Sequence, residues 1–485
     1  MENGKKNPLK TEATERTAGI ELIRGLGLWA AVAVVIGDTI GSGIFLVPSA
    51  MARMVGSTAL VFAAWIVGGL IVLSGAFCYA ELGATFPKAG GPYAYLTRGL
   101  GPLWGFLFGW MSAFLERPVA MATLAAGFAR FLGFLFPAIA MPMFTIHFAG
   151  GELPVTMAQP LAAGVVIFVT AINYLSVKMS GAIQIGLTSA KVGTIVLIVA
   201  GGLLFGAKHV ATAANVIPAG HSSIFGAIFA VLAALVPAMW AYNGFNDLGH
   251  LGEEVIDAQK NMPRAILIGL GTIGVLYITA NVVYFRVLGF AAVATSMHVA
   301  SDAIRTFAGD KGAIALTVAM AISALGALHV VVMTGARIPY AMARDGVFFS
   351  FASRLQPKLR TPSGSLIFLG AVGTILALSG TYEQLYSLFV FALWIFMGLT
   401  AIALLRLRWK EPELARPFRA WGYPVTPIVF LLAAIAITGS LLRENPVRSA
   451  VGLVVIGAGV PFYFVWRRRS GGVSEVVARE IEGRS

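Results

Sequence analysis

The residues best placed to bind a small molecule lie in a glycine-rich break inside the first long apolar segment. Residues 36–48 read Ile-Gly-Asp-Thr-Ile-Gly-Ser-Gly-Ile-Phe-Leu-Val-Pro. Lipid offers no hydrogen-bond partners, so the backbone groups freed by a break at Gly41 to Gly43 must face protein, water or a ligand. A helix ending near Ile40 presents free carbonyl groups, which attract an ammonium group. A helix beginning at Ser42 and Gly43 presents free N–H groups, which attract a carboxylate.

A second irregular stretch, Pro237 to Asp247, places a proline, a glycine and two asparagines inside the apolar segment 222–250. If the helix is interrupted there, the carbonyl groups of Trp240, Ala241 and Asn243 add further acceptors for an ammonium group. Ammonium-binding acceptors beside carboxylate-binding donors match the constant part of an α-amino acid. Trp240 is large enough to cover such a ligand as a gate. Interrupted helices at equivalent positions of two inverted halves indicate the binding site of a secondary transporter.

Two charged residues are expected to be buried in the membrane near these breaks. Lys191 lies well inside an apolar segment, where a lysine costs about 2.5–3.5 kcal/mol, so it is a functional candidate. Its ammonium can stand where a cotransported sodium would bind, carry a proton, or neutralise Asp38. Asp38, one turn before the first break, can pair with Lys191, bind a cation or face the cytoplasmic vestibule. His329 is a weaker candidate, because a lone membrane histidine is more often a packing residue.

The composition predicts an integral membrane protein. The chain is 58% hydrophobic and 12% charged, against roughly 45–50% and 25% in ordinary globular proteins. Apolar runs of about 20 residues, long enough to span a bilayer, recur through the chain. We expect an all-α fold of about twelve transmembrane helices at 27–54, 58–85, 101–131, 158–176, 182–206, 222–250, 264–289, 312–341, 363–380, 384–408, 423–442 and 447–467.

The formal charge of +13 is interpreted as a topology signal rather than as a nucleic-acid-binding surface. Lysines and arginines gather in alternate loops, whereas residues 132–160 contain none. The positive-inside rule then places both termini in the cytoplasm. The first 20 residues are polar, with no cleavable signal peptide. The single cysteine, Cys78, falls inside the second span, so neither an intramolecular disulfide nor a disulfide-linked partner subunit is expected.

Several motifs, in order along the chain, resemble the amino acid–polyamine–organocation superfamily. They are Ile40-Gly-Ser-Gly-Ile-Phe, the run from Ala80-Glu-Leu-Gly to Gly91-Pro-Tyr-Ala-Tyr95, Asn173-Tyr-Leu-Ser-Val-Lys178, Lys191, Gly252-Glu-Glu-Val, Asn261-Met-Pro-Arg, Ala343-Arg-Asp-Gly and Arg416-Pro-Phe-Arg. The later motifs are similar to its L-type amino acid transporter branch. The resemblance covers about Gly25 to Val465.

The resemblance implies a leucine-transporter fold with a five-plus-five inverted repeat, discontinuous helices 1 and 6, and alternating access. Repeat one is expected at about 27–206, repeat two at about 222–408 and two extra helices at about 423–467. Together they form one transporter domain at 25–468 between cytoplasmic tails at 1–24 and 469–485. The resemblance also implies that Ile40, Trp240, Ala241 and Asn243 bind the substrate amine, that Ser42 and Gly43 bind its carboxylate, and that Lys191 replaces a sodium ion.

We therefore predict a sodium-independent secondary transporter for neutral L-amino acids in the bacterial inner membrane, working as an exchanger or coupled to protons through Lys191 and Asp38. Its partners are the amino acid, protons and the lipid bilayer, with no cofactor and no metal site. A cationic amino acid or polyamine carrier is the first alternative, provided that Asp38 faces the pocket. A transporter-like nutrient sensor is the second, although tails this short leave little room for a signalling domain. An enzyme is disfavoured because the six histidines are scattered and form no metal-binding motif.

Overall fold

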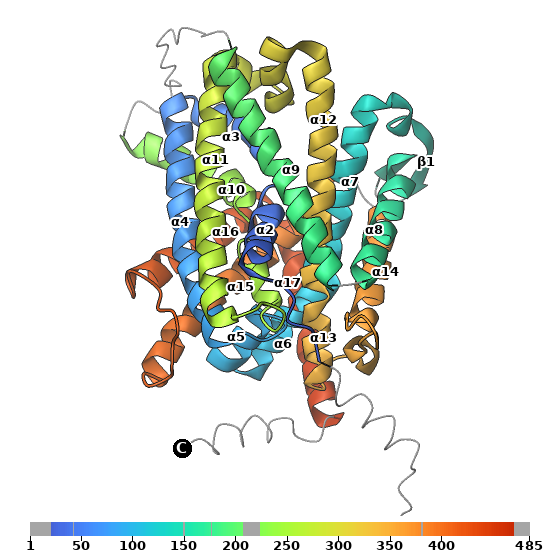
Figure 1. Cartoon of the computed structure of the whole chain (residues 1–485), viewed down its shortest axis with the longest axis vertical. Coiled ribbons are helices and arrows are strands. Elements are labelled where there is room, and N and C mark those ends of the chain that lie inside the picture. The colour runs from blue at the N-terminus through green and yellow to red at the C-terminus, as the bar shows by residue number, and fades with distance from the viewer. Residues whose placement is uncertain are drawn as a thin grey trace, which may run out of the picture.

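The computed structural model describes residues 21–41, 43–148, 151–175, 177–206, 224–379 and 382–469. Long helices run side by side along one axis, and shorter helices cap the bundle at one end (Figure 1). The helices are α2 (Leu28–Thr39), α3 (Gly43–Val55), α4 (Thr58–Thr85), α5 (Pro92–Gly99), α6 (Pro102–Met111), α7 (Arg117–Leu135), α8 (Ala158–Leu175), α9 (Val177–Leu204), α10 (Ile224–Ala241), α11 (Ala258–Thr295), α12 (Val299–Gly335), α13 (Arg337–Arg344), α14 (Ser363–Ser379), α15 (Tyr382–Lys410), α16 (Val425–Glu444) and α17 (Pro446–Arg469).

Each of the twelve predicted spans has a counterpart among the described residues. Nine helical spans are long and apolar enough to cross a membrane, and the bent pair α2–α3 makes a tenth. Two shorter apolar helices, Phe225–Ala241 and Ser363–Ser379, lie where the sixth and ninth spans are expected. The helical, multi-pass membrane fold predicted from hydropathy is thus confirmed.

The first predicted break is present. Helix α2 ends at Thr39, α3 begins at Gly43, and their axes are bent by 41°. The second irregularity also ends a helix, because α10 stops at Ala241 and only a short 3₁₀ turn, η3 (Asp247–His250), follows before α11. The sixth span is therefore shorter as a helix than the predicted 222–250.

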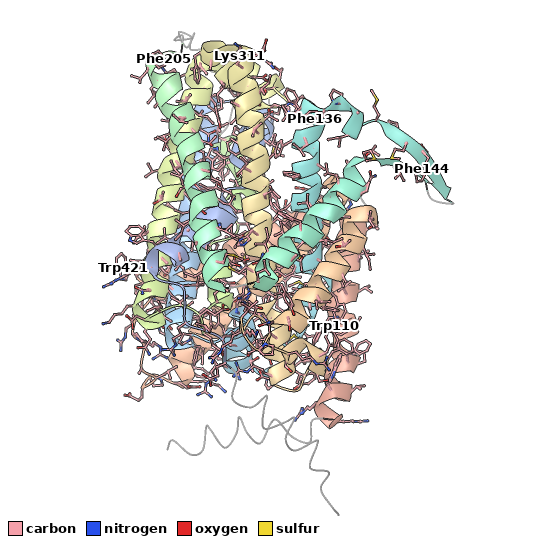
Figure 2. All side chains as sticks on the ribbon, turned by 45° about the vertical axis from the view of Figure 1, so that its right-hand side comes forward. Trp110, Phe136, Phe144, Phe205, Lys311 and Trp421 are labelled. Carbon is pink, nitrogen blue, oxygen red and sulfur yellow. The ribbon has the colours of Figure 1, made fainter. Side chains whose placement is uncertain are left out.

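Two local features were not predicted from the sequence. Between α6 and α7, the residues of η1 (Ser112–Glu116) form one π-helical turn; such turns are rare and often occur at functional sites. After α7, the loop forms a two-stranded antiparallel hairpin, β1 (Pro142–Phe148) and β2 (Gly151–Thr156). The hairpin projects from the bundle, and its Phe144 points outward (Figures 1 and 2).

An aromatic cluster packs against the end of α10. Trp65 on α4, Tyr242 just after α10 and Tyr277 on α11 are almost fully buried, with ring centroids 5.3–5.6 Å apart. Aromatic pairs at this spacing contribute about 0.5–1.5 kcal/mol beyond their buried area. The cluster therefore fixes where the end of α10 lies relative to α4 and α11.

Candidate functional site

The two helix breaks meet at a cavity enclosing about 60 Å³. Segments from five spans line it: α2–α3, η1 with the first turns of α7, the end of α10 with the turns after it, α12, and α15. The lining residues are Asp38, Thr39, Gly41, Gly43, Glu116, Arg117, Ala120, Thr123, Leu124, Trp240, Ala241, Asn243, Asp247, Val331 and Leu393. Five of the predicted site residues are thus brought together, with the half-buried Trp240 in the wall.

Glycines allow the two breaks to touch. A Cβ atom on Gly43 would lie 2.8 Å from the Ala241 Cα, and one on Gly244 would lie 2.8 Å from the Thr39 backbone nitrogen. Gly244 also has a φ of 122°, a conformation that glycine adopts without the steric cost of a side chain. Because Gly43 begins α3, its turn presents backbone N–H groups that have no partner within the helix. Gly43 itself lines the cavity.

Tyr277 holds the two breaks together from α11. Its hydroxyl oxygen lies 3.0 Å from the Thr39 carbonyl oxygen and 2.9 Å from the Ala241 carbonyl oxygen. A tyrosine hydroxyl has one proton, so it donates to one of these carbonyls at a time. Each carbonyl lies at the C-terminal end of a helix, α2 or α10, where the last carbonyl groups lack helical partners.

Lys191 reaches the first break from α9. Its ammonium nitrogen donates to the carbonyl oxygens of Gly37 at 2.5 Å and Ile40 at 2.9 Å, and the side chain is almost completely buried. Gly326 on α12 leaves room for it, since a Cβ atom there would lie 2.9 Å from the lysine Cε. Among the described residues, Lys191 forms no ion pair with Asp38 within 4.0 Å. It is fixed to the unwound end of α2, as expected of a residue that ties the fifth span to the first.

The Ile40 carbonyl is already occupied. It accepts hydrogen bonds from Lys191 and from Ser323 on α12 at 3.2 Å, and Ile40 is fully buried and does not line the cavity. A carbonyl oxygen has two lone pairs, so no acceptor position remains for a substrate amine. Ser42 lies outside the described residues. His329 is buried away from the cavity, with Nδ1 at 3.2 Å from the Gln184 side-chain oxygen.

The expectation that Lys191 and Asp38 are the two buried charges is wrong. A larger buried cluster lies beside the cavity, and three of its members, Glu116, Arg117 and Asp247, line it. Arg117 forms a bidentate ion pair with Asp247, one contact being the Nη2–Oδ1 hydrogen bond of 2.8 Å. Its Nε donates to Glu116 at 3.2 Å, and its Nη2 lies 3.0 Å from the His250 ring. All four side chains are at most 4% exposed. The cluster joins η1 and α7 to the segment that follows α10.

The sequence did contain a signal for this cluster. Ionisable residues inside a membrane span are rare and mark functional sites, and Glu116 and Arg117 lie side by side within the predicted span 101–131. The same reasoning that singled out Lys191 applies to both. Their convergence with Asp247 could not be derived in that way, because the side chains are separated by 130 positions in the chain.

A second group of buried polar contacts lies at the end of the bundle where α13 lies. Arg337 pairs with Glu254 at 2.6 Å, both nearly inaccessible to solvent, and the Glu254 carbonyl accepts hydrogen bonds from the backbone of Gly25 and Leu26. Tyr93 donates to Asp345 at 2.6 Å, while burial raises the pKa of the Asp345 carboxyl group. The Glu254 contacts thus join the chain before α2 to the segment before α11 and, through Arg337, to α13.

A bundle of membrane-spanning helices with two facing breaks around a polar cavity defines a secondary-transporter class of protein. Comparison with known protein families supports this class, since the amino acid permease family matches residues 26–460. The chain is 28% identical over 477 residues to the b(0,+)-type amino acid transporter 1 of Mus musculus, covering 97% of this chain and 93% of that protein. It is 30% identical over 466 residues to the large neutral amino acids transporter small subunit 2 of Homo sapiens, covering 95% and 84%. The chain belongs to the amino acid permease family.

Proposed function

We propose that this permease transports neutral L-amino acids across the membrane without sodium, as an exchanger or with proton coupling. The observation that carries the proposal is the ammonium of Lys191 on the carbonyl oxygens of Gly37 and Ile40. A fixed positive charge on these carbonyls leaves no need for a sodium ion at the break. Relatives named as b(0,+)-type and large neutral amino acid transporters support amino acids as the substrate class.

In the proposed mode of binding, the substrate carboxylate lies at the N-terminus of α3, at the backbone N–H groups of Ser42 and Gly43. The amine lies toward the end of α10, at the carbonyl groups of Trp240, Ala241 and Asn243. Ile40 is not retained as an amine ligand because its carbonyl is already occupied. Trp240 acts as the gate over the ligand.

A cationic amino acid or a polyamine is the second candidate substrate. Asp38 lines the cavity, which is the placement that a basic substrate requires. A carboxylate facing the ligand can pair with a second ammonium or guanidinium group of the substrate. The name of the b(0,+)-type relative is compatible with this candidate.

The arrangement in the membrane is part of the same proposal. We place the protein in the bacterial inner membrane with both termini cytoplasmic, which assigns the hairpin end to the outside. Lys311 and Phe205 lie at that end, whereas Trp110 and Trp421 lie in the opposite half (Figure 2). We retain one transporter domain at 25–468, with repeats at 27–206 and 222–408. The buried Cys78 on α4 supports function without a disulfide-linked subunit.

Uptake into liposomes that contain the purified protein tests the proposal. Labelled leucine, alanine, arginine and putrescine would be offered with and without sodium, a proton gradient and internal amino acid. Uptake of leucine or alanine that is indifferent to sodium supports the proposal, and dependence on internal substrate identifies an exchanger. A requirement for sodium would overturn the role of Lys191, and uptake restricted to arginine or putrescine would favour the second candidate. No uptake under any condition would favour a nutrient sensor.

A further inference from the structure

We propose that the hydroxyl group of Thr123 binds the substrate side chain, and that it selects small neutral amino acids carrying a side-chain hydroxyl over apolar amino acids of the same shape. This selectivity rests on the proposed transport of neutral amino acids and narrows the substrates to the serine and threonine type. Three features of the cavity support it: the residues of one wall, the hydrogen bonds that these residues lack, and the enclosed volume.

One wall of the cavity, the side-chain wall, comes from α7, α12 and α15 and not from the helix breaks. It consists of Ala120, Thr123, Leu124, Val331 and Leu393, and α7 and α12 run side by side (Figure 1). In the proposed binding mode the two breaks hold the carboxylate and the amine, so the substrate side chain extends toward this wall. Thr123 is the polar residue among these five, and the other four are apolar.

The Thr123 hydroxyl does not make the hydrogen bond that threonines in helices often make. Several threonine hydroxyls of this protein donate to the carbonyl oxygen four residues earlier, at 2.9 Å for Thr317, 2.9 Å for Thr334 and 2.8 Å for Thr400. Thr123 is only 1% exposed, and its hydroxyl oxygen has no hydrogen-bond partner in the part of the chain that the structure describes. Buried polar atoms nearly always have a partner, so a ligand in the cavity is the group that can supply one.

Two further lining residues have unpartnered oxygens, and both lie at the helix breaks. The Thr39 hydroxyl oxygen and the Asn243 side-chain oxygen are buried and, within the described ranges, have no hydrogen-bond partner. Thr39 ends α2, and Asn243 follows the end of α10. An ammonium group donates three hydrogen bonds, so these two oxygens add acceptors on the side where the amine is proposed to bind. The Thr123 hydroxyl, on α7, is left for the substrate side chain.

The charged cluster beside the cavity offers no donor to an acidic side chain. A guanidinium carries five N–H donors, and those of Arg117 are all directed to groups of the protein. They point to Glu116, to both carboxylate oxygens of Asp247, to the Thr334 hydroxyl and to the His250 ring. The cluster is thus neutralised internally, which favours a substrate whose side chain carries no negative charge.

The volume of the cavity favours a small amino acid. It encloses about 60 Å³. Because a water molecule requires about 10–15 Å³, the cavity has room for roughly four to six groups of that size. This fits an amino acid whose side chain has only a few atoms. Serine and threonine combine that size with a hydroxyl group, which can donate to the Thr123 hydroxyl or accept from it.

The selectivity arises from the cost of leaving a buried hydroxyl unpaired. L-Threonine and L-valine have nearly the same shape, but only L-threonine can form a hydrogen bond with Thr123. A site that hydrogen-bonds a substrate hydroxyl discriminates against the analogue that lacks it, because its own polar group is then left without a partner. For one neutral hydrogen bond, we expect a difference of about 10- to 100-fold in affinity.

Calorimetric titration of the purified protein with four amino acids tests this selectivity. Kd would be measured for L-threonine, L-valine, L-serine and L-alanine. We expect L-threonine to bind about 10- to 100-fold more tightly than L-valine, and L-serine more tightly than L-alanine. Thr123→Val keeps the shape of the side chain and removes its hydroxyl, so the two Kd values of the first pair should come within about threefold of each other. Thr123→Ser keeps the hydroxyl and should keep the preference.

Thr170→Val is the matched control. The Thr170 hydroxyl is also buried and, among the described residues, has no hydrogen-bond partner. Thr170 lies on α8 and does not belong to the cavity lining. If an unpartnered hydroxyl matters only where a ligand can reach it, this variant should prefer L-threonine as strongly as the unmodified protein does.

Equal affinities for L-threonine and L-valine in the unmodified protein would overturn the role of Thr123, whether or not the variants fold. An undiminished preference in Thr123→Val, at an unchanged melting temperature, would also overturn it, because another group would then recognise the substrate hydroxyl. Failure of all four amino acids to bind would count instead against the proposed transport of neutral amino acids.

Discussion

Replacement of Gly43 by alanine is the sharpest test of the site, because the added methyl group would meet backbone. Its Cβ would lie 2.8 Å from the Ala241 Cα and 2.9 Å from the Ala241 Cβ. Carbon atoms in van der Waals contact are separated by about 3.5–4.0 Å, so the two breaks must move apart by about 0.7 Å. Neither contact atom belongs to a long side chain that can rotate away. The start of α3 must therefore shift relative to the end of α10.

The cost of that shift sets the expected effect. Overpacking a well-packed region costs about 1–3 kcal/mol. If all of this cost falls on the ligand-bound state, it corresponds to a loss of about 5- to 150-fold in affinity. Binding of the best substrate from the uptake panel would be measured by scintillation proximity, beside the thermal stability of each variant.

The matched control lies two residues away. A Cβ on Gly41 would have nothing within 4 Å, although Gly41 also lines the cavity. Gly41→Ala should change affinity by less than about threefold, which corresponds to under 1 kcal/mol. Equal affinity in Gly43→Ala and the unmodified protein would refute the close approach of the two breaks as a requirement for binding.

Three further predictions concern the residues that contact the helix breaks and the buried ion pair near α13. Lys191→Ala leaves a carbonyl at the end of α2 without its donor, which should cost about 1–3 kcal/mol of folding stability. The protein should still insert into the membrane, but uptake should fall or change its pH dependence. Unchanged uptake across pH would contradict coupling through this residue. Tyr277→Phe should cost about 0.5–1.5 kcal/mol of folding stability and slow uptake. Tyr284→Phe is the control, because the buried Tyr284 hydroxyl has no hydrogen-bond partner among the described residues, and it should leave uptake unchanged. Equal effects of the two substitutions would argue against the role of the Tyr277 hydroxyl in holding the two breaks together. Glu254→Gln leaves a buried arginine without its ion-pair partner and should cost about 3–5 kcal/mol of unfolding free energy. Glu253→Gln, in a partly exposed pair, should cost about 0–1 kcal/mol. Similar melting temperatures of the two variants would count against a stabilising role of the Arg337–Glu254 pair.

The placement of the spans was predictable because hydropathy is a local property. A run of apolar residues long enough to cross a bilayer must be helical to satisfy its backbone, whatever its neighbours are. The break at Gly41 to Gly43 and the end of the helix near Asn243 were predictable for the same reason, since glycine and proline act on the backbone where they occur. Lys191 stood out because a charge in an apolar run is costly wherever the run lies.

The tertiary structure alone decided which backbone groups remain available for a ligand. The sequence treated every carbonyl group at a break as free, but Lys191 and Ser323 occupy that of Ile40, and Tyr277 lies against those of Thr39 and Ala241. These donors come from α9, α11 and α12, and their reach depends on how each helix is rotated in the bundle. Rotation follows from the packing of whole helix faces, which no single segment specifies.

The sequence therefore determined where this protein crosses the membrane, where two helices break and that amino acids suit those breaks. The structure decided that Arg117 forms an ion pair with Asp247 and that Asp38 and Asp247 line the same cavity. Such contacts join residues far apart in the chain, and their charge state depends on every partner at once. Local sequence fixes the backbone of each helix, whereas only the assembled bundle fixes the electrostatics between them.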